Sequence, residues 1–100
     1  MLDSTPETGP AGTALSGIRV VELANFISGP FIGMQLADYG ADVIKIEHPT
    51  RGDGLRGWGN LKNGIGLYHK VLNRNKRSVS ADLGTPLGVE IVRRLVARAD

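Results

Sequence analysis

Positive charge gathers in one part of this chain, where it could bind an anion. Residues 51–77 contain seven Lys or Arg and one acid, Asp53, which gives the segment a charge of +6. The whole chain carries +2, so the remainder carries −4. Three of the cations, Arg74, Lys76 and Arg77, lie in one short string. Guanidinium and ammonium groups hold phosphates through charge-assisted hydrogen bonds. The string therefore predicts contact with an anionic ligand, and a solvated basic surface is the alternative.

A second candidate anion site is the tight joint Ser28-Gly29-Pro30. It follows a β-branched run, residues 18–23, and precedes an expected helix. Free backbone N–H groups at the start of a helix favour an anion. No Gly-x-Gly-x-x-Gly pattern is present, so a plain helix-start turn is the alternative.

The two histidines differ in their surroundings. His48 ends a second apolar run, just before Pro49, where a nucleotide-binding sheet commonly meets ribose or adenine. Its imidazole could stack on adenine, and an ordinary loop residue is the alternative. His69 has no ligand-type neighbour at useful spacing and the chain has no Cys, so we expect no metal site.

No residue set predicts a catalytic centre. There is no Ser-His-Asp arrangement and no pair of carboxylates at meaningful spacing. The aspartates are better explained by element ends and turns. The aromatic side chains of Trp58 and Tyr68 are interpreted as packing anchors of a Gly-rich segment rather than as platforms for bases.

Alternating strands and helices must position these groups. We expect strands over 18–23, 42–47 and 78–83, a helix over 30–39 buried on most sides, and a largely irregular segment 50–72 with a helical turn at 68–72. Gly40 should stop the first helix, and Gly33 should admit another backbone. A last helix should begin at Thr85 and Pro86, with Glu90 and Arg94 paired on its outer face.

This order predicts an α/β fold with a parallel sheet, because strands joined through a helix pair in parallel. Ligands of such sheets bind at the carboxyl ends of the strands. The alternation also predicts a further strand after Asp100.

The composition limits the number of domains and the class of protein. The chain has 100 residues, of which 41% are hydrophobic and 22% charged, which suits one globular domain at most. Residues 1–14 resemble a flexible tail and lack the features of a signal peptide. No apolar run approaches the roughly 20 residues that span a bilayer. We expect a cytoplasmic protein without membrane contact.

Several motifs, taken in order, resemble the start of class III CoA-transferases, the family of formyl-CoA transferase and carnitine CoA-transferase. The resemblance covers about residues 15–100. It rests on the segments 15–23, Ser28-Gly29-Pro30, 36–47, Gly52-Asp53, 73–78 and 82–88.

The resemblance implies a partial Rossmann-like domain in residues 15–100, the N-terminal part of a CoA-transferase large domain. It also implies interlocked homodimers of the full-length enzyme. Coenzyme A is the implied ligand, and we expect no metal. The implied contacts of CoA are Ile27, Ser28, His48, Arg74, Lys76, Arg77, Ala81, Asp82, Leu83 and Gly84. An Arg is frequent in the family where His48 stands, and a Lys where Gly84 stands.

In such enzymes an Asp carboxylate attacks the acyl-CoA thioester and forms a mixed anhydride, while CoA departs and returns. The resemblance places that Asp downstream of the matched region, so no catalytic residue is assigned here. The implied function is CoA transfer between an acyl-CoA and a carboxylic acid.

Three alternatives stay open. Racemases of 2-methylacyl-CoA share the opening motifs, but the long Gly-rich stretch 51–72 favours the transferases. A CoA- or nucleotide-binding module without chemistry is the second. A nucleic-acid-binding protein that uses the basic string is the third, and we expect no nucleic acid partner.

Overall fold

The computed structural model describes residues 12–100. Residues 1–11 of the expected tail lie outside the described residues. The rest of that segment contacts the folded part, because Thr13 packs against Gly40. The amide of Leu15 also donates to the carbonyl of Tyr39, over 2.9 Å.

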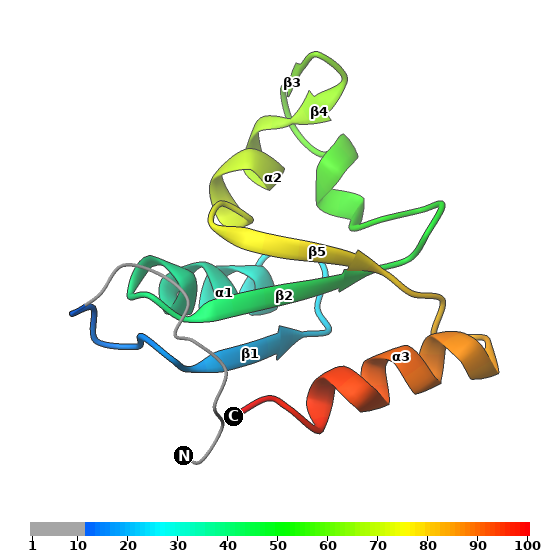
Figure 1. Cartoon of the computed structure of the whole chain (residues 1–100). Helices are drawn as coiled ribbons and strands as arrows, with labels where there is room; N and C mark the ends of the chain where they lie inside the picture. Colours follow the sequence, from blue (N-terminus) through cyan, green and yellow to red (C-terminus); the bar gives the residue numbers. More distant parts are fainter. Residues whose placement is uncertain (1–11) are drawn as a thin grey trace.

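The centre of the molecule is a three-stranded parallel sheet (Figure 1). Its strands are β1 (Arg19–Glu22), β2 (Asp42–Glu47) and β5 (Lys76–Ser80), in the order β1-β2-β5. Val20 pairs with Val43 of β2, and Val43 pairs with Lys76 of β5. Every residue of β2 is buried, as expected of the middle strand. The predicted α/β fold with a parallel, partial Rossmann-like sheet is confirmed.

Two helices flank the sheet. α1 (Ser28–Asp38) connects β1 to β2, and α3 (Pro86–Val96) follows β5. Tyr39 caps α1 and Gly40 follows in the left-handed region, at φ +104°, so the predicted stop is confirmed. Thr85 caps α3 by accepting a hydrogen bond from the amide of Gly88 at 3.1 Å. The Glu90–Arg94 pair is present, at 3.1 Å.

The segment between β2 and β5 is more regular than predicted. It contains a 3₁₀ helix, η1 (Gly54–Gly57), an antiparallel hairpin of β3 (Leu61–Lys62) and β4 (Ile65–Gly66), and α2 (Leu67–Leu72). Its glycines suggested irregular structure. Instead they permit close packing: at Gly66, a side chain would collide with the backbone of η1.

The two faces of the sheet have different characters, because successive strand residues point to opposite sides. One face is apolar: Ile44 and Ile46 cluster with Ala81 and with Val92 of α3. On the α1 face, Val43 clusters with Ala37, but the next positions toward the carboxyl ends carry charges. The charged side chains on this face are Glu22, Lys45, Glu47 and Lys76.

Three local predictions were wrong. The third strand starts two residues earlier than expected and ends at Ser80, since Asp82 already forms a turn with Gly84. α1 is not buried on most sides, because Phe31 and Ile32 are exposed. α1 also begins at Ser28, so Pro30 is its third residue rather than its first.

Candidate functional site

A hollow of about 470 Å³ lies at the carboxyl ends of the three parallel strands. Three loops line it, one after each strand. The lining residues are Leu23, Ala24, Asn25, Phe26, Ile46, Glu47, His48, Arg51, Gly52, Gly54, Ala81, Asp82, Leu83 and Gly84. The structure therefore brings together five predicted site residues: His48, Ala81, Asp82, Leu83 and Gly84. The position is the one where open α/β sheets bind ligands.

Backbone amides fix the imidazole of His48. Its Nδ1 accepts hydrogen bonds from the amides of Thr50 and Arg51, each at 3.2 Å. A nitrogen that accepts in this way carries no proton, so the hydrogen-bond pattern assigns the proton to Nε2. Nε2 lies 3.7 Å from Oδ2 of Asp82. The ring is therefore held by the backbone of its own turn, with Nε2 directed at a carboxylate in the wall of the hollow.

The loop after β5 is held by the start of α3. Oδ1 of Asp82 accepts from the amide of Gly84 at 2.8 Å, and the hydroxyl of Thr85 donates to the carbonyl of Asp82 at 2.9 Å. Gly88 lies against the backbone of Asp82, where a larger residue would collide. This wall of the hollow is thus well ordered before any ligand arrives.

Glu47 joins β2 to the loop that follows it. Its carboxylate accepts two hydrogen bonds from the guanidinium of Arg56, each at 2.7 Å, and one from the amide of Asp53 at 2.9 Å. Ser78 of β5 donates a further bond at 3.1 Å. The Arg56 guanidinium, aided by the Asp53 amide and the Ser78 hydroxyl, lowers the pKa of Glu47 to about 2 against the effect of burial.

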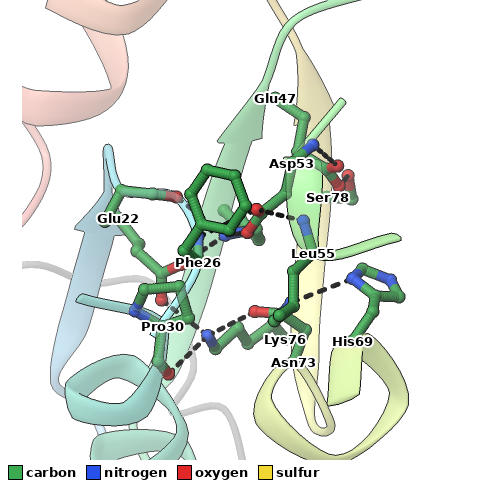
Figure 2. A network of polar contacts seen from close by, with 12 residues as sticks. Glu22, Phe26, Pro30, Glu47, Asp53, Leu55, His69, Asn73, Lys76 and Ser78 are labelled. Carbon is green, nitrogen blue, oxygen red and sulfur yellow. Dashed lines mark hydrogen bonds and ion pairs between the residues drawn. The ribbon is translucent and has the colours of Figure 1, made fainter. Parts of the chain in front are cut away.

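A network of four buried charges lies beneath the hollow, on the α1 face of the sheet. Lys45 Nζ lies 2.7 Å from Glu22 and 2.9 Å from Asp53. Lys76 Nζ lies 2.7 Å from the other oxygen of Glu22. Figure 2 shows Lys76 also reaching the carbonyl of Pro30 and the side chain of Asn73, at 2.8 and 2.7 Å. Two cations and two anions balance, as buried charges must.

This network shapes the loop after β1. Lys45 donates to the carbonyl of Ala24 at 2.9 Å, and Asp53 accepts from the amide of Phe26 at 2.9 Å. Phe26 is held at φ +64°, a left-handed conformation that non-glycine residues seldom adopt. Burial would raise the pKa of Asp53, but the Leu55 amide, Lys45 and the Phe26 amide together lower it. Residues on β2 and in the next loop thus set the wall at Ala24 and Phe26.

The basic string lies elsewhere. Arg74 pairs with Asp38 at 2.6 Å, and Arg77 pairs with Asp42 at 2.7 Å. The side chain of Lys76 is 2% exposed and belongs to the buried network. The string leads into β5 at the end of the sheet opposite the hollow, and the structure does not bring it together with His48 or Asp82.

Ile27 and Ser28 are also set apart from the hollow. Ile27 lines a second, largely apolar depression of about 490 Å³ with Leu67, Tyr68 and Val71. Ser28 is the first residue of α1. The neighbours Ala24, Asn25 and Phe26 line the main hollow instead.

Arg51 lines the hollow but is not among the site residues expected from the sequence. Arg51 was counted only as part of the basic segment, although it follows His48 by three residues in a Gly-rich turn. That spacing was the available signal, because a short turn keeps its residues near the end of the strand. Phe26 gave no signal, since its conformation depends on Asp53.

Trp58 and Tyr68 were predicted as packing anchors, and their rings do contact each other, with centroids 5.8 Å apart. Within residues 12–100, no group of three or more His, Cys, Asp or Glu could hold a metal ion. In the same range, no helix is long and apolar enough to cross a bilayer.

Known proteins with similar sequences transfer CoA. The chain is 52% identical over 93 residues to a succinate–glutarate CoA-transferase of Agrobacterium fabrum, covering 86% of this chain and 23% of the relative. It is 49% identical over 87 residues to a succinyl-CoA–D-citramalate CoA-transferase of Chloroflexus aurantiacus, covering 86% and 22%. A formyl-CoA:oxalate CoA-transferase of Afipia carboxidovorans is 41% identical over 88 residues, covering 87% and 21%. The chain thus spans about a quarter of the length of these curated relatives.

A solved structure has the same arrangement. A CAIB/BAIF family protein from Brucella suis matches with a TM-score of 0.81 and 49% identity, over 88% of this chain and 24% of that one. The model of CoA-transferase family III matches residues 15–100. With a parallel sheet, a hollow at the ends of its strands and this match along most of its length, the chain belongs to CoA-transferase family III.

Proposed function

We propose that this chain forms the CoA-binding N-terminal part of a CoA-transferase large domain, with residues 1–14 as a tail and 15–100 as the domain segment. The observation that carries the proposal is the hollow at the carboxyl ends of β1, β2 and β5. There, His48 and residues 81–84 meet, the residues for which family resemblance implies contact with adenosine. The base would stack on the imidazole of His48, beside the wall formed by residues 81–84.

The proposed reaction moves CoA from an acyl-CoA to a carboxylic acid. A carboxylate of an Asp outside this chain attacks the thioester carbonyl, the C–S bond breaks, and CoA leaves as a thiolate while an acyl-aspartyl anhydride forms. The thiolate then attacks the aspartyl carbonyl, which releases the first acid and gives an aspartyl-CoA thioester. Reversal of these steps with the acceptor acid produces the new acyl-CoA.

The names of the relatives suggest the substrates. Several of them are named for succinyl-CoA together with glutarate, D-citramalate or L-malate, all short dicarboxylic acids. We infer that the whole protein acts on succinyl-CoA and a similar acid, as a cytoplasmic homodimer. Nothing in this proposal involves nucleic acid, a membrane or a metal.

The test uses the protein with its full natural chain. Incubation with succinyl-CoA and glutarate should produce glutaryl-CoA, and incubation with succinyl-CoA alone should add the mass of CoA less one water to the protein, as an aspartyl-CoA thioester requires. Hydrogen exchange with CoA present should slow at residues 23–26, 48–54 and 81–84. Exchange at residues 60–72 serves as the internal control and should not change.

Two results would contradict the proposal. Inversion of a 2-methylacyl-CoA without any transfer would favour the racemase alternative. Protection by CoA that is confined to residues 74–77 would place the ligand at the opposite end of the sheet.

A further inference from the structure

We propose that Arg51 binds the 3′-phosphate of CoA. This inference rests on the proposed function and adds a residue that determines the specificity for that ligand. Arg51 is one of the seven Lys and Arg residues in the basic segment 51–77.

Most cations of the basic segment already have partners. Arg56, Arg74 and Arg77 are paired with carboxylates, and Lys76 is buried in the charge network. Lys70 donates to a backbone carbonyl, and Lys62 lies in the hairpin. Arg51 is exposed, and its guanidinium has no hydrogen bond or ion pair with any residue in 12–100. It is also the only Lys or Arg among the lining residues of the hollow that the structure describes.

The turn that carries Arg51 is firmly held. The Arg51 amide donates to Nδ1 of His48 at 3.2 Å, and the Gly52 amide donates to the His48 carbonyl at 3.0 Å. Gly52 adopts φ +61°, which glycine accepts without strain. The backbone of Arg51 is therefore fixed beside the imidazole, while its side chain is free to meet a ligand.

The other charges of the hollow leave a phosphate without a counterion unless Arg51 supplies one. Glu47 is neutralised by its two bonds to Arg56. The Nδ1 atom of His48 already accepts from two backbone amides and its Nε2 atom faces Asp82, and Gly84 brings no side chain. Asp82 is negative and repels a phosphate, so it suits the amino group of a base or a ribose hydroxyl instead. Among the described residues that line the hollow, Arg51 is thus the cation that can pair with a phosphate.

Of the phosphates of CoA, the 3′-phosphate is the one that Arg51 is placed to bind. That group is attached to the ribose, next to the base, whereas the pyrophosphate leads away toward the pantetheine arm. Arg51 is three residues from His48, in the same turn, so it reaches the ribose end of a base held at His48. A guanidinium offers five donors in a plane and matches phosphate geometry better than an ammonium does.

The experiment compares two ligands on the full natural chain. The dissociation constants of CoA and of 3′-dephospho-CoA are measured by titration calorimetry for the natural protein and for Arg51→Gln. The substitution should raise the dissociation constant of CoA about tenfold, as expected for the loss of one exposed charge-assisted hydrogen bond. The dissociation constant of 3′-dephospho-CoA should change by less than about twofold, since that ligand lacks the 3′-phosphate. Lys62→Gln, at an exposed cation of the hairpin that does not line the hollow, is the matched control and should change neither constant.

The results separate this inference from the proposed function. If the natural protein binds neither ligand, the proposed CoA site and the role of Arg51 are both wrong. If it binds CoA but Arg51→Gln weakens the two ligands equally, or neither, the phosphate assignment is overturned and the CoA site stands. Because Arg51 is exposed, unchanged circular dichroism and unfolding of the variant should exclude a loss of fold.

Discussion

At the scale of the residue, Glu47 shows how a charge that lines the hollow also stabilises the fold. Its side chain is 5% exposed, and its carboxylate connects β2 to Arg56, Asp53 and Ser78. Folding lowers its pKa from the ordinary value of 4.5 to about 2. The stabilisation is therefore complete above pH 4.5 and is lost as the pH falls through about 2.

Replacement of this carboxylate should remove that dependence on pH. We expect Glu47→Gln to lower the free energy of unfolding by about 1–3 kcal/mol at neutral pH, because Arg56 loses its charged partner while half-exposed. The gap to the natural protein should narrow below pH 4.5 and close near pH 2. Urea unfolding of both proteins between pH 2 and pH 7 measures this difference in the free energy of unfolding. Glu90→Gln is the control, since that exposed carboxylate should contribute less than about 0.5 kcal/mol.

A constant gap at every pH would show that Glu47 acts through packing and not through its charge. An increase in the stability of Glu47→Gln over the natural protein at neutral pH would contradict the prediction outright.

Residue types could be predicted from the sequence better than their partners. The resemblance to class III CoA-transferases implies one site for His48 and residues 81–84, and in the structure these residues meet because they follow the neighbouring strands β2 and β5. The charge of the string Arg74, Lys76 and Arg77 predicts contact with phosphate, but it does not reveal the partners that the structure shows, Asp38, Glu22 and Asp42. Those carboxylates are more than thirty positions away along the chain.

At the scale of the element, α1 can approach the sheet only because it has a glycine at the contact. Gly33 was expected to admit another backbone, but it admits side chains instead. A Cβ there would overlap Oε1 of Glu22 and come within 3.2 Å of Cε of Lys76. The helix therefore closes over the charge network and keeps it dry.

This contact reverses the usual preference for alanine in helices. Gly→Ala in a helix interior normally stabilises by about 1 kcal/mol. We expect Gly33→Ala to destabilise the protein by about 1–3 kcal/mol, because Glu22 and Lys76 must move and are ion-paired. Thermal or urea unfolding measures the change.

Gln35→Ala, at an exposed position of the same helix, is the matched control and should be neutral or slightly stabilising. Equal stability of Gly33→Ala and the natural protein would show that α1 has room to shift.

The helices and strands of the sheet could be predicted because their signals are local: β-branched runs, Gly40 after α1, and Thr85 with Pro86 before α3. In the segment between β2 and β5, only α2 could be predicted, as the helical turn expected at 68–72. The glycines suggested loops elsewhere, but the segment forms η1 and a hairpin, and Leu55 of η1 packs against Met34 and Leu72, which lie far from it in sequence.

At the scale of the whole molecule, the described chain exposes a large apolar surface. Phe31 and Ile32 of α1 are 46% and 59% exposed, and Tyr68 and Val71 of α2 are 54% and 52% exposed. The two helices are neighbours through Met34 and Leu72. Soluble monomers seldom leave so much apolar surface in water.

We therefore expect the 100-residue chain, produced alone, to self-associate as its concentration rises. Light scattering after gel filtration measures the mass. The double variant Ile32→Lys/Val71→Lys should shift the distribution toward the monomer, whereas Arg74→Lys/Arg98→Lys, with unchanged charge, should not. A monomer with a sharp, cooperative unfolding transition would contradict this expectation.

The four buried charges beneath the hollow limit the substitutions that this sequence can accept during evolution. Lys45, Glu22, Asp53 and Lys76 balance as a set, so the loss of any one leaves the buried group with an uncompensated charge. Substitution should then proceed through pairs, in which a lysine and a carboxylate become neutral together. Among descendants of this chain, the four positions should vary jointly or not at all, even though up to fifty-four positions separate them along the sequence.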